Sequence, residues 1–303
     1  MFDFRKIQLS DRDRANAALG VSDFQGCEYS FANNLSWHRL ADTLMTFDGD
    51  FYISCSFYDG EPVFIMPAGV PLDGQGRARY LDLFCRLERF VARDGHLLRV
   101  CSVTDDSLGW LKGEFPCVEV TSSRDSSDYI YDTNDLITLP GKRFHDKRGH
   151  IKSFKQHDWY CRELTAEDFD ECALFAAGSY SSDEFSAAVE QYAIHSFFTN
   201  FDTLELKGLA LYFEGELAGF TIGERLNSDT FVVHIEKARG DIRGAYPTLA
   251  NEFASRFAAG LRFINREEDL GLEGLRCSKL SYHPVKLLEK YTLTFPEGSF
   301  RYC

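Results

Sequence analysis

Two segments of the chain share an alternating pattern of apolar and polar residues around a short turn. Residues 50–67 contain the run FYISCSFY, the turn Asp59-Gly60 and the run PVFIMP. Residues 206–226 contain KGLALYF, the turn Glu214-Gly215 and LAGFTIGERL. Apolar runs with a period of two around an acidic residue and a glycine are typical of β-hairpins. We therefore predict one hairpin in each half of the chain.

An amphipathic helix is predicted after each hairpin. Residues 78–94 and 247–259 carry apolar side chains at every third or fourth position, which is the spacing of one helix face. Each segment ends at a glycine, Gly95 or Gly260, and glycine is the residue preferred after the last turn of a helix. The two halves therefore continue to resemble each other.

A further strand is predicted after each helix, at residues 97–103 and 261–265. The second half has one more apolar run at 230–238, which we interpret as an added strand. We predict two copies of a hairpin–helix–strand unit; a chance likeness between two α/β halves is the alternative. The predicted fold class is α/β (α+β), with two mixed, mostly antiparallel sheets flanked by helices.

A boundary between the two units is expected where Leu139-Pro140-Gly141 interrupts regular structure. The predicted domains are residues 1–138 and 139–303. The second opens with a helix at 142–155, whose apolar stripe consists of Phe144, Ile151 and Phe154.

This predicted helix is strongly basic in an acidic chain. It contains six Lys or Arg residues against one acid, whereas the whole chain has a net charge of −14. Because an acidic protein repels nucleic acid in general, no DNA partner is expected. A positive patch confined to one helix face would instead attract one anionic group to one place; this face consists of Arg148, Lys152 and Lys155.

Several common function classes lack their sequence signatures. The chain has no GxxxxGK[ST], GxSxG, HExxH or GxGxxG motif, which argues against P-loop ATPases, α/β hydrolases, zincins and classical dinucleotide enzymes. The nine cysteines contain no CxxC pair, so neither a metal site nor a disulfide framework is predicted. The charged N-terminus is no signal peptide, and no apolar run could span a membrane. A cytoplasmic protein with no integral membrane segment is expected.

The loop at 239–246 is a candidate anion site. It connects the predicted strand at 230–238 to a helix beginning at Pro247, and it contains Arg239 and Arg243. A glycine-containing loop that leads into a helix N-terminus presents backbone N–H groups to an anion. A tight turn with solvated arginines is the alternative.

Polar residues also follow two predicted strands. Asn265, Arg266, Glu268 and Asp269 come after the strand at 261–265, where a cleft is expected in an open α/β sheet. Their carboxylates could accept a proton from a nucleophilic amine or hold a substrate ammonium, although a solvated charged loop is the alternative.

Further candidates lie on the neighbouring strand and near the C-terminus. Glu236 and Lys237 stand where the strand at 230–238 leaves the sheet, while His234 is interpreted as a core or sheet-face histidine. Lys279 and Tyr282 flank a proline-containing loop near the C-terminus.

Five runs of residues resemble one known family. They are KRFHDKRGHIKSFKQ (142–156), HIEKARGDIRGAY (234–246), INREEDLGLEGLRCSKLSYHPVKLLEKY (264–291) and FANNLSW with FIMPAG (31–37, 64–69). They are similar to soluble proteins grouped with the C-terminal domain of bacterial phosphatidylglycerol lysyltransferases and, more distantly, to Fem-type peptidyltransferases. The resemblance implies two tandem GNAT-like domains, the first of them degenerate.

The resemblance also implies acyl or aminoacyl transfer, with aminoacyl-tRNA as the donor. By position, Arg148 and Lys152 would meet the phosphates of the donor, and Lys279 would match a lysine of the family's C-terminal block. The acetyl-CoA pattern R/Q-x-x-G-x-G/A is broken, because Asp241 and Tyr246 occupy two of its places if Gly244 is the central glycine. A lipid acceptor is not implied.

The resulting hypothesis is transfer of an acyl or aminoacyl group to an amine or hydroxyl of a small molecule or peptide. No tightly bound cofactor is expected, and the co-substrate is aminoacyl-tRNA or acyl-CoA. The alternatives are a CoA-dependent N-acetyltransferase and a non-catalytic protein that binds a small anionic metabolite. The predicted site residues are Glu236, Glu268 and Asp269 for catalysis, Arg143, Arg148, Lys152, Lys237, Arg239, Arg243 and Lys279 for the donor, and Asn265, Arg266 and Tyr282 for the acceptor.

Overall fold

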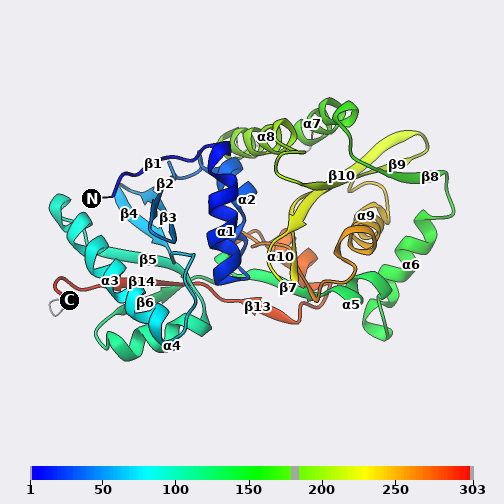
Figure 1. The fold of residues 1–303 in the computed structure, drawn as a ribbon. Helices are drawn as coiled ribbons and strands as arrows, with labels where there is room; N and C mark the ends of the chain where they lie inside the picture. Colours follow the sequence, from blue (N-terminus) through cyan, green and yellow to red (C-terminus); the bar gives the residue numbers. More distant parts are fainter. Residues whose placement is uncertain (1, 179–183, 301–303) are drawn as a thin grey trace. The chain divides into compact units, whose positions relative to one another are not determined.

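The computed structural model describes residues 2–178 and 184–300, which form two units. Unit 2 comprises Asp128–Leu287, and unit 1 comprises the described residues before and after that range. Each unit is built around one sheet with helices on its faces (Figure 1). This confirms the predicted α/β class and the mixed, mostly antiparallel sheets.

The sheet of unit 1 has seven strands in the order β1-β2-β3-β4-β5-β14-β6. The β4–β5 pair is parallel, and the other pairs described are antiparallel. The strands are β1 (Arg5–Lys6), β2 (Leu44–Asp48), β3 (Phe51–Tyr58), β4 (Glu61–Ile65), β5 (Leu98–Val103), β6 (Glu119–Ser122) and β14 (Tyr291–Phe295). The helices are α1 (Arg12–Ser22), α2 (Phe31–Trp37), α3 (Gly74–Val91) and α4 (Asp105–Glu114).

Successive side chains of β3 point to opposite faces of this sheet, as they do along any β-strand. Phe51, Ile53 and Cys55 pack with α3 residues such as Tyr80 and Phe84 in the core. Tyr52 and Ser54 point to the opposite face and line a polar pocket.

The sheet of unit 2 has seven strands in the order β13-β7-β12-β11-β10-β9-β8. The β11–β12 pair is parallel. The strands are β7 (Asp128–Asp132), β8 (Trp159–Glu163), β9 (Lys207–Phe213), β10 (Glu216–Arg225), β11 (Thr230–Ala238), β12 (Phe263–Asn265) and β13 (Lys286–Leu288). The helices are α5 (Thr133–Thr138), α6 (His145–Phe154), α7 (Phe169–Ala177), α8 (Glu184–Thr199), α9 (Ala245–Phe253) and α10 (Glu273–Leu280).

Helices cover both faces of the second sheet. Figure 1 shows α7 and α8 on one side and α9 on the other, and both α7 and α9 contact β10. A β-bulge lies at Ala218, because the register with β9 shifts between Leu217 and Gly219. Ala218 therefore belongs to the core that includes Leu249 of α9, whereas Phe220 packs against Phe175 and Phe198 on the opposite face.

Both predicted hairpins are confirmed, and their turns have the same backbone geometry. β3–β4 turns at Asp59-Gly60 with φ of 53° and 83°, and β9–β10 turns at Glu214-Gly215 with φ of 50° and 81°. Two successive residues with positive φ form the turn that suits the twist of antiparallel strands.

The two halves repeat each other more fully than predicted. Each unit has three successive antiparallel strands (β2–β3–β4 and β9–β10–β11), a helix (α3 and α9) and a strand parallel to the third (β5 and β12). The run at 230–238 is therefore the counterpart of β4 and no added strand, because unit 1 has β2 before its hairpin. The sequence pattern had matched the hairpin β3–β4 with the hairpin β9–β10. In the structure, the counterpart of β3–β4 is β10–β11.

The observed units differ from the predicted boundary after residue 138. β7 pairs with β12 in the second sheet, and β14 pairs with β5 and β6 in the first. Each sheet thus takes one strand from the far side of the expected boundary. Leu139 and Gly141 do interrupt regular structure, with φ of 48° and 72°, but they lie between α5 and α6 inside unit 2.

Candidate functional site

The two parallel strands of unit 2 separate after a short pairing. β11 pairs with β12 over Thr230–Val232 and Phe263–Asn265, and β11 then continues to Ala238 paired with β10 on its other side. Glu236 Oε1 and Arg266 Nη2, 2.5 Å apart, form an ion pair beyond the last paired residues. Ligands of α/β proteins commonly bind at such carboxyl ends of strands. The structure thus brings together Glu236 and Arg266, which were predicted separately.

Arg266 is held in a buried aromatic setting. Its guanidinium carbon lies 4.8 Å from the ring centroid of Tyr282 and 5.7 Å from that of Tyr131. Burial alone would lower the pKa of Arg266, but Glu236 and the tyrosines raise it, so the side chain stays charged. Within the described residues, the buried Nη1 atom has no hydrogen-bond partner. It is a cationic donor that a ligand oxygen could use.

Lys147 of α6 completes this cluster. Its Nζ lies 3.8 Å from the ring centroid of Tyr282, and it makes no ion pair with any residue that the structure describes. Burial, and then repulsion by Arg266, lower the pKa of Lys147 to about 8. Lys147 was counted among the six cations but was not selected from the sequence. Its spacing from Phe144 and Ile151 places it on the packed face, which could have identified it.

The predicted basic helix is confirmed as a 3₁₀ turn at Lys142–Phe144 followed by α6. Its cations are used in different ways. Arg143 forms an ion pair with Asp135, and Arg148 donates to the carbonyl oxygens of Leu139 and Gly141.

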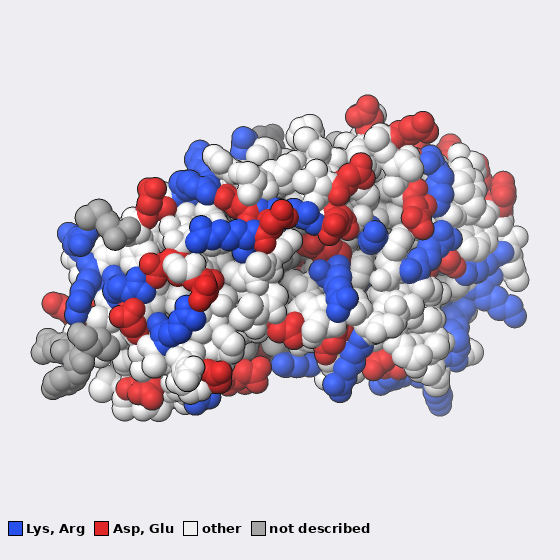
Figure 2. Space-filling model, viewed as in Figure 1, with Lys and Arg blue, Asp and Glu red and all other residues white. Residues whose placement is uncertain are grey.

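The remaining cations of this helix differ in whether they make an ion pair. Lys155 Nζ lies 2.5 Å from Glu252 Oε1. Among the described residues, Lys142 and Lys152 are exposed and make no ion pair. On the face shown in Figure 2, Lys and Arg side chains gather over α6, at the right-hand edge of the view. Part of the predicted basic face is thus available to an anion.

The loop at 239–246 lies against α6. A Cβ on Gly244, which has φ of 97°, would come within 2.6 Å of the carbonyl oxygen of His150. This close approach places the start of α9 next to the basic helix. α9 begins at Ala245, so Pro247 is its third residue and not its first as predicted.

The cations of this loop and of β11 are mostly paired. Arg239 forms ion pairs with Glu216 and Asp241, and Lys237 pairs with Glu190 at 3.1 Å. Arg243 is exposed. The donor-binding roles of these residues stay predictions.

Lys279 anchors the loop that carries Arg266. It is buried, and its Nζ donates to the carbonyl oxygens of Arg266 at 2.7 Å, Glu267 at 3.3 Å and Glu268 at 2.5 Å. Burial lowers the pKa of Lys279. This geometry supports a positioning role rather than direct contact with a donor.

Asp269 and Asn265 hold the same loop from other sides. Asp269 accepts hydrogen bonds from Tyr129 at 2.5 Å and from Arg276 at 2.9 Å, and the bond from Arg276 holds the pKa of Asp269 far below its usual range. Asn265 donates to Asp128 at 2.8 Å. The geometry favours an anchoring role for both, and the catalytic role of Asp269 stays a prediction, as does that of Glu268.

His234 is a sheet-face histidine, as interpreted from the sequence. Its Nδ1 lies 2.9 Å from Glu267 and its Nε2 lies 3.2 Å from Glu224. Burial by itself would lower the pKa of His234, but these carboxylates outweigh it and raise the pKa to about 9. The imidazolium ties β10 and β11 to the loop after β12.

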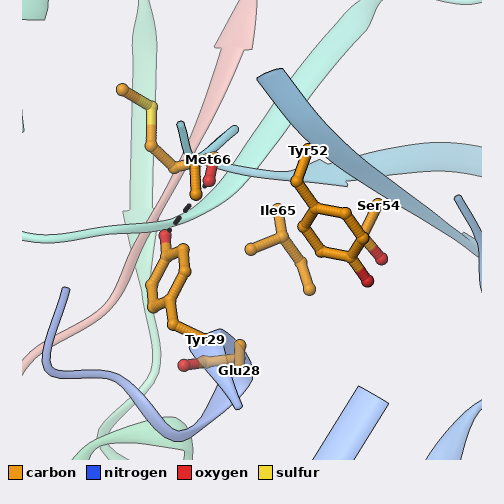
Figure 3. A pocket seen from close by; sticks show the side chains of 7 residues that line it. Glu28, Tyr29, Tyr52, Ser54, Ile65 and Met66 are labelled. Carbon is orange, nitrogen blue, oxygen red and sulfur yellow. Dashed lines mark hydrogen bonds between the residues drawn. The ribbon is translucent and has the colours of Figure 1, made fainter. Parts of the chain in front are cut away.

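Unit 1 has a small polar pocket beside its own parallel pair, β4–β5 (Figure 3). Its volume is about 10 Å³, roughly the space of one water. It is too small for an acyl carrier. The pocket is lined by Glu28, Tyr29, Tyr52, Ser54, Ile65, Met66 and Ala68.

None of the described helices is long and apolar enough to cross a membrane. The chain is 34% identical to a conserved protein of unknown function from Bacteroides thetaiotaomicron, whose structure it matches with a TM-score of 0.89 over 97% of this chain and all of that one. A curated relative from Mycoplasmoides gallisepticum, the uncharacterized protein MYCGA3080, is 25% identical over 199 residues. That match covers 62% of each chain, less than two thirds of the relative's length.

More distant structures show the same fold. L-PGS from Bacillus licheniformis is 15% identical, with a TM-score of 0.63 over 95% of this chain and 92% of that one. FemX, at 9% identity, covers 96% of each chain with a TM-score of 0.61, and a tandem GNAT protein from the clavulanic acid pathway, at 13% identity, covers 97% and 98% with 0.50. The fold is thus the predicted tandem GNAT-like one.

The model of the family described as phosphatidylglycerol lysyltransferase, C-terminal, matches residues 20–294, which is nearly the whole chain. This match supports aminoacyl transfer as the general class of activity. The chain therefore belongs to the family of the C-terminal domain of phosphatidylglycerol lysyltransferases.

Proposed function

We propose that this protein transfers an aminoacyl group from an aminoacyl-tRNA to an amine or hydroxyl of a small molecule or peptide. The observation that carries the proposal is the buried Nη1 of Arg266, a donor without a partner among the described residues. It lies beside the carboxylate of Glu236, at the carboxyl ends of diverging parallel strands. An unpaired buried donor is costly until an acceptor reaches it, so this atom points to a ligand oxygen.

An aminoacyl ester offers the groups that this cluster lacks. Its carbonyl oxygen can accept from Nη1 of Arg266, and this hydrogen bond strengthens as negative charge develops on that oxygen during attack. The α-ammonium of the aminoacyl group can approach Glu236, whose negative carboxylate balances the positive charge of the ammonium. Glu236 and Arg266 would then recognise the two ends of one aminoacyl group.

The phosphates of the donor require cations that are free to meet them. Lys142 and Lys152 fit, because both are exposed and neither makes an ion pair within the described residues. The start of α9 lies against α6 through Gly244, and a helix N-terminus adds partial positive charge. Acyl-CoA has less support, because Arg239 is held by Asp241 and Glu216 in the loop where its pyrophosphate would bind.

Binding of charged and uncharged tRNA, measured over a range of salt concentrations, tests the proposal. The logarithm of the binding constant should fall linearly with the logarithm of the salt concentration. Replacing Lys142 and Lys152 together with alanine should reduce the slope by about 2, roughly 1 per lost phosphate contact. The control is Lys112→Ala, an exposed lysine of α4 in unit 1, which should leave the slope unchanged.

Arg266→Lys tests recognition of the aminoacyl group separately. It should remove the preference for charged over uncharged tRNA while the salt slope stays the same, because the phosphate contacts remain. Equal affinity of the unaltered protein for charged and uncharged tRNA would contradict the proposal. A preference for charged tRNA without transfer to any amine or hydroxyl would mean that the protein only binds the aminoacyl-tRNA. This result would also contradict the proposed function.

A further inference from the structure

Lys147 differs from the other cations of its helix because it faces inward. It lies three residues after Phe144 and four before Ile151, both of which are buried, so it shares their side of α6. Its Nζ lies 3.8 Å from the ring centroid of Tyr282. The amine is therefore held at the site, whereas Lys142 and Lys152 are exposed on the surface.

No carboxylate of the described chain pairs with Lys147. The charged and titratable groups that face it from other elements are Arg266 after β12, Glu236 of β11 and Tyr282 after α10. Glu236 is already bound to Arg266 at 2.5 Å, and burial raises the pKa of Tyr282, which keeps its phenol neutral. Arg266 repels the charged form of the lysine. This setting favours a lysine that can lose its proton near neutral pH.

Two of the three acids predicted for catalysis are less suited to that task. Asp269 is bound to Arg276 and Tyr129, and its pKa lies far below its usual range, so it is a poor proton acceptor. Glu236 is occupied by Arg266. Of Lys147 and Arg266, the two cations at this cluster, Lys147 makes no ion pair with any residue that the structure describes.

We infer that Lys147 is the general base of aminoacyl transfer, which rests on the proposed function. The neutral amine of Lys147 takes the proton that the acceptor amine or hydroxyl loses as its nitrogen or oxygen bonds to the ester carbonyl carbon. The bond between that carbon and the ribose oxygen of the tRNA then breaks. The ammonium of Lys147 returns the proton to the leaving ribose oxygen, so one proton moves from acceptor to ribose and Lys147 is regenerated.

Chemical labelling tests the state of Lys147 without any substrate. The folded protein is treated briefly with acetic anhydride over a pH series, and each acetylated lysine is quantified by mass spectrometry relative to the exposed Lys152. Only neutral amines react, so labelling of Lys147 should rise through a midpoint near pH 8, below the value of about 10.4 for a lysine in a model peptide. Labelling of Lys147 with a midpoint at that model-peptide value, or only on unfolding, would overturn the inference.

Single-turnover transfer from charged tRNA to ethanolamine, a probe with both an amine and a hydroxyl, tests the role itself. Lys147→Gln should lower the rate about 10²- to 10⁴-fold and remove the rise in rate toward pH 8, with affinity for charged tRNA little changed. Lys147→Arg should be equally slow, because a guanidinium keeps its proton. The control, Lys152→Gln, should weaken binding without altering the pH profile.

The two ideas fail in different ways. Transfer by Lys147→Arg at the unaltered rate would reduce Lys147 to a positioning cation and overturn the inference, while the proposed function would stand. Absence of any preference for charged tRNA would overturn the proposed function, whatever the labelling shows. Melting temperatures of Lys147→Gln and Lys147→Arg within a few degrees of the unaltered protein would exclude misfolding as the cause of a slow rate.

Discussion

Glu236 of β11 and Arg266 after β12 are joined by an ion pair, 2.5 Å from Oε1 to Nη2, beyond the point at which the two parallel strands separate. Each side chain is only 10% exposed. Thirty residues separate them in the sequence, and the parallel pairing of their strands brings them together. The pair leaves Nη1 of Arg266 as a donor with no protein acceptor among the described residues.

A double-mutant cycle should show strong coupling in this pair. Arg266→Met leaves the carboxylate of Glu236 buried and unpaired, and loss of one partner of a buried pair costs about 3–5 kcal/mol. Combining it with Glu236→Gln should recover a large part of that loss. Urea unfolding measures each free energy. As a control, the exposed pair of Arg79 and Asp50 should couple by less than about 1 kcal/mol; additivity at Glu236 and Arg266 would contradict the buried-pair interpretation.

Contact between α9 and α6 depends on the absence of a side chain at Gly244. In Gly244→Ala, the new Cβ would come within 2.6 Å of the carbonyl oxygen of His150 and 2.9 Å of Cβ of Phe154, at a φ of 97°. The strained backbone alone costs about 1–3 kcal/mol, and separation of the helices should also weaken binding of charged tRNA. Thermal unfolding and the binding assay measure both effects.

The same loop supplies a matched control in Gly240. A Cβ there would have no neighbour within 4 Å, and the residue does not have positive φ. Gly240→Ala should therefore change stability by no more than about 0.5 kcal/mol. Equal effects of the two substitutions would show that the close approach of Gly244 to α6 does not matter.

The polar pocket of unit 1 should hold an ordered water. The hydroxyls of Tyr52 and Ser54 line it (Figure 3), both are buried, and neither has a hydrogen-bond partner within the described chain. A water there would satisfy both, as buried waters usually make about three hydrogen bonds. Ser54→Ala should then lower stability by about 1 kcal/mol, since the water loses a partner.

Whether Ser54→Ala lowers or raises the stability shows whether a water bridges the two hydroxyls. If nothing bridges the two hydroxyls, Ser54→Ala removes an unsatisfied buried group and should raise the melting temperature. Tyr80→Phe is the reference for loss of a bonded buried hydroxyl, because Tyr80 donates to the carbonyl oxygen of Pro67 at 2.8 Å. A high-resolution crystal structure of the unaltered protein would locate the water directly.

The features of the fold that depend on residues close together in the sequence were predicted correctly. The hairpin turns at Asp59-Gly60 and Glu214-Gly215 follow from local backbone preferences, and the helix at Lys142–Phe154 follows from its apolar spacing. Pairing of β7 with β12 and of β14 with β5 joins segments more than 100 residues apart, and no local signal encodes such pairs. This is why the domain boundary and the register of the repeat were misplaced.

The candidate site was predicted in its parts but not as a whole. Glu236 and Arg266 were selected because each ends a strand, while their contact depends on how β11 and β12 pair. Lys147 was not selected from the sequence, because a search for clusters of charge identifies the exposed face of a helix. This lysine lies on the packed face of α6. His234 was interpreted correctly as a sheet-face residue, but its partners Glu224 and Glu267 lie 10 and 33 residues away.

His234 should make the stability of the protein depend on pH. Its pKa is raised to about 9, above the value of about 6.5 in an unfolded chain, because Glu224 and Glu267 outweigh the opposing effect of burial. The folded state therefore holds a proton that the unfolded state releases. The stabilisation is fully present below about pH 6.5 and is lost as the pH rises through about 9; it amounts to roughly 3 kcal/mol at most.

Comparison with His234→Gln isolates this contribution, because other groups, Lys147 included, titrate in the same range. The free energy of unfolding from urea titrations should exceed that of His234→Gln most at pH 6, and the difference should shrink steadily to pH 9.5. A difference that does not vary with pH would mean that the pKa of His234 is the same in the folded and unfolded states, and would contradict the proton held by the folded protein.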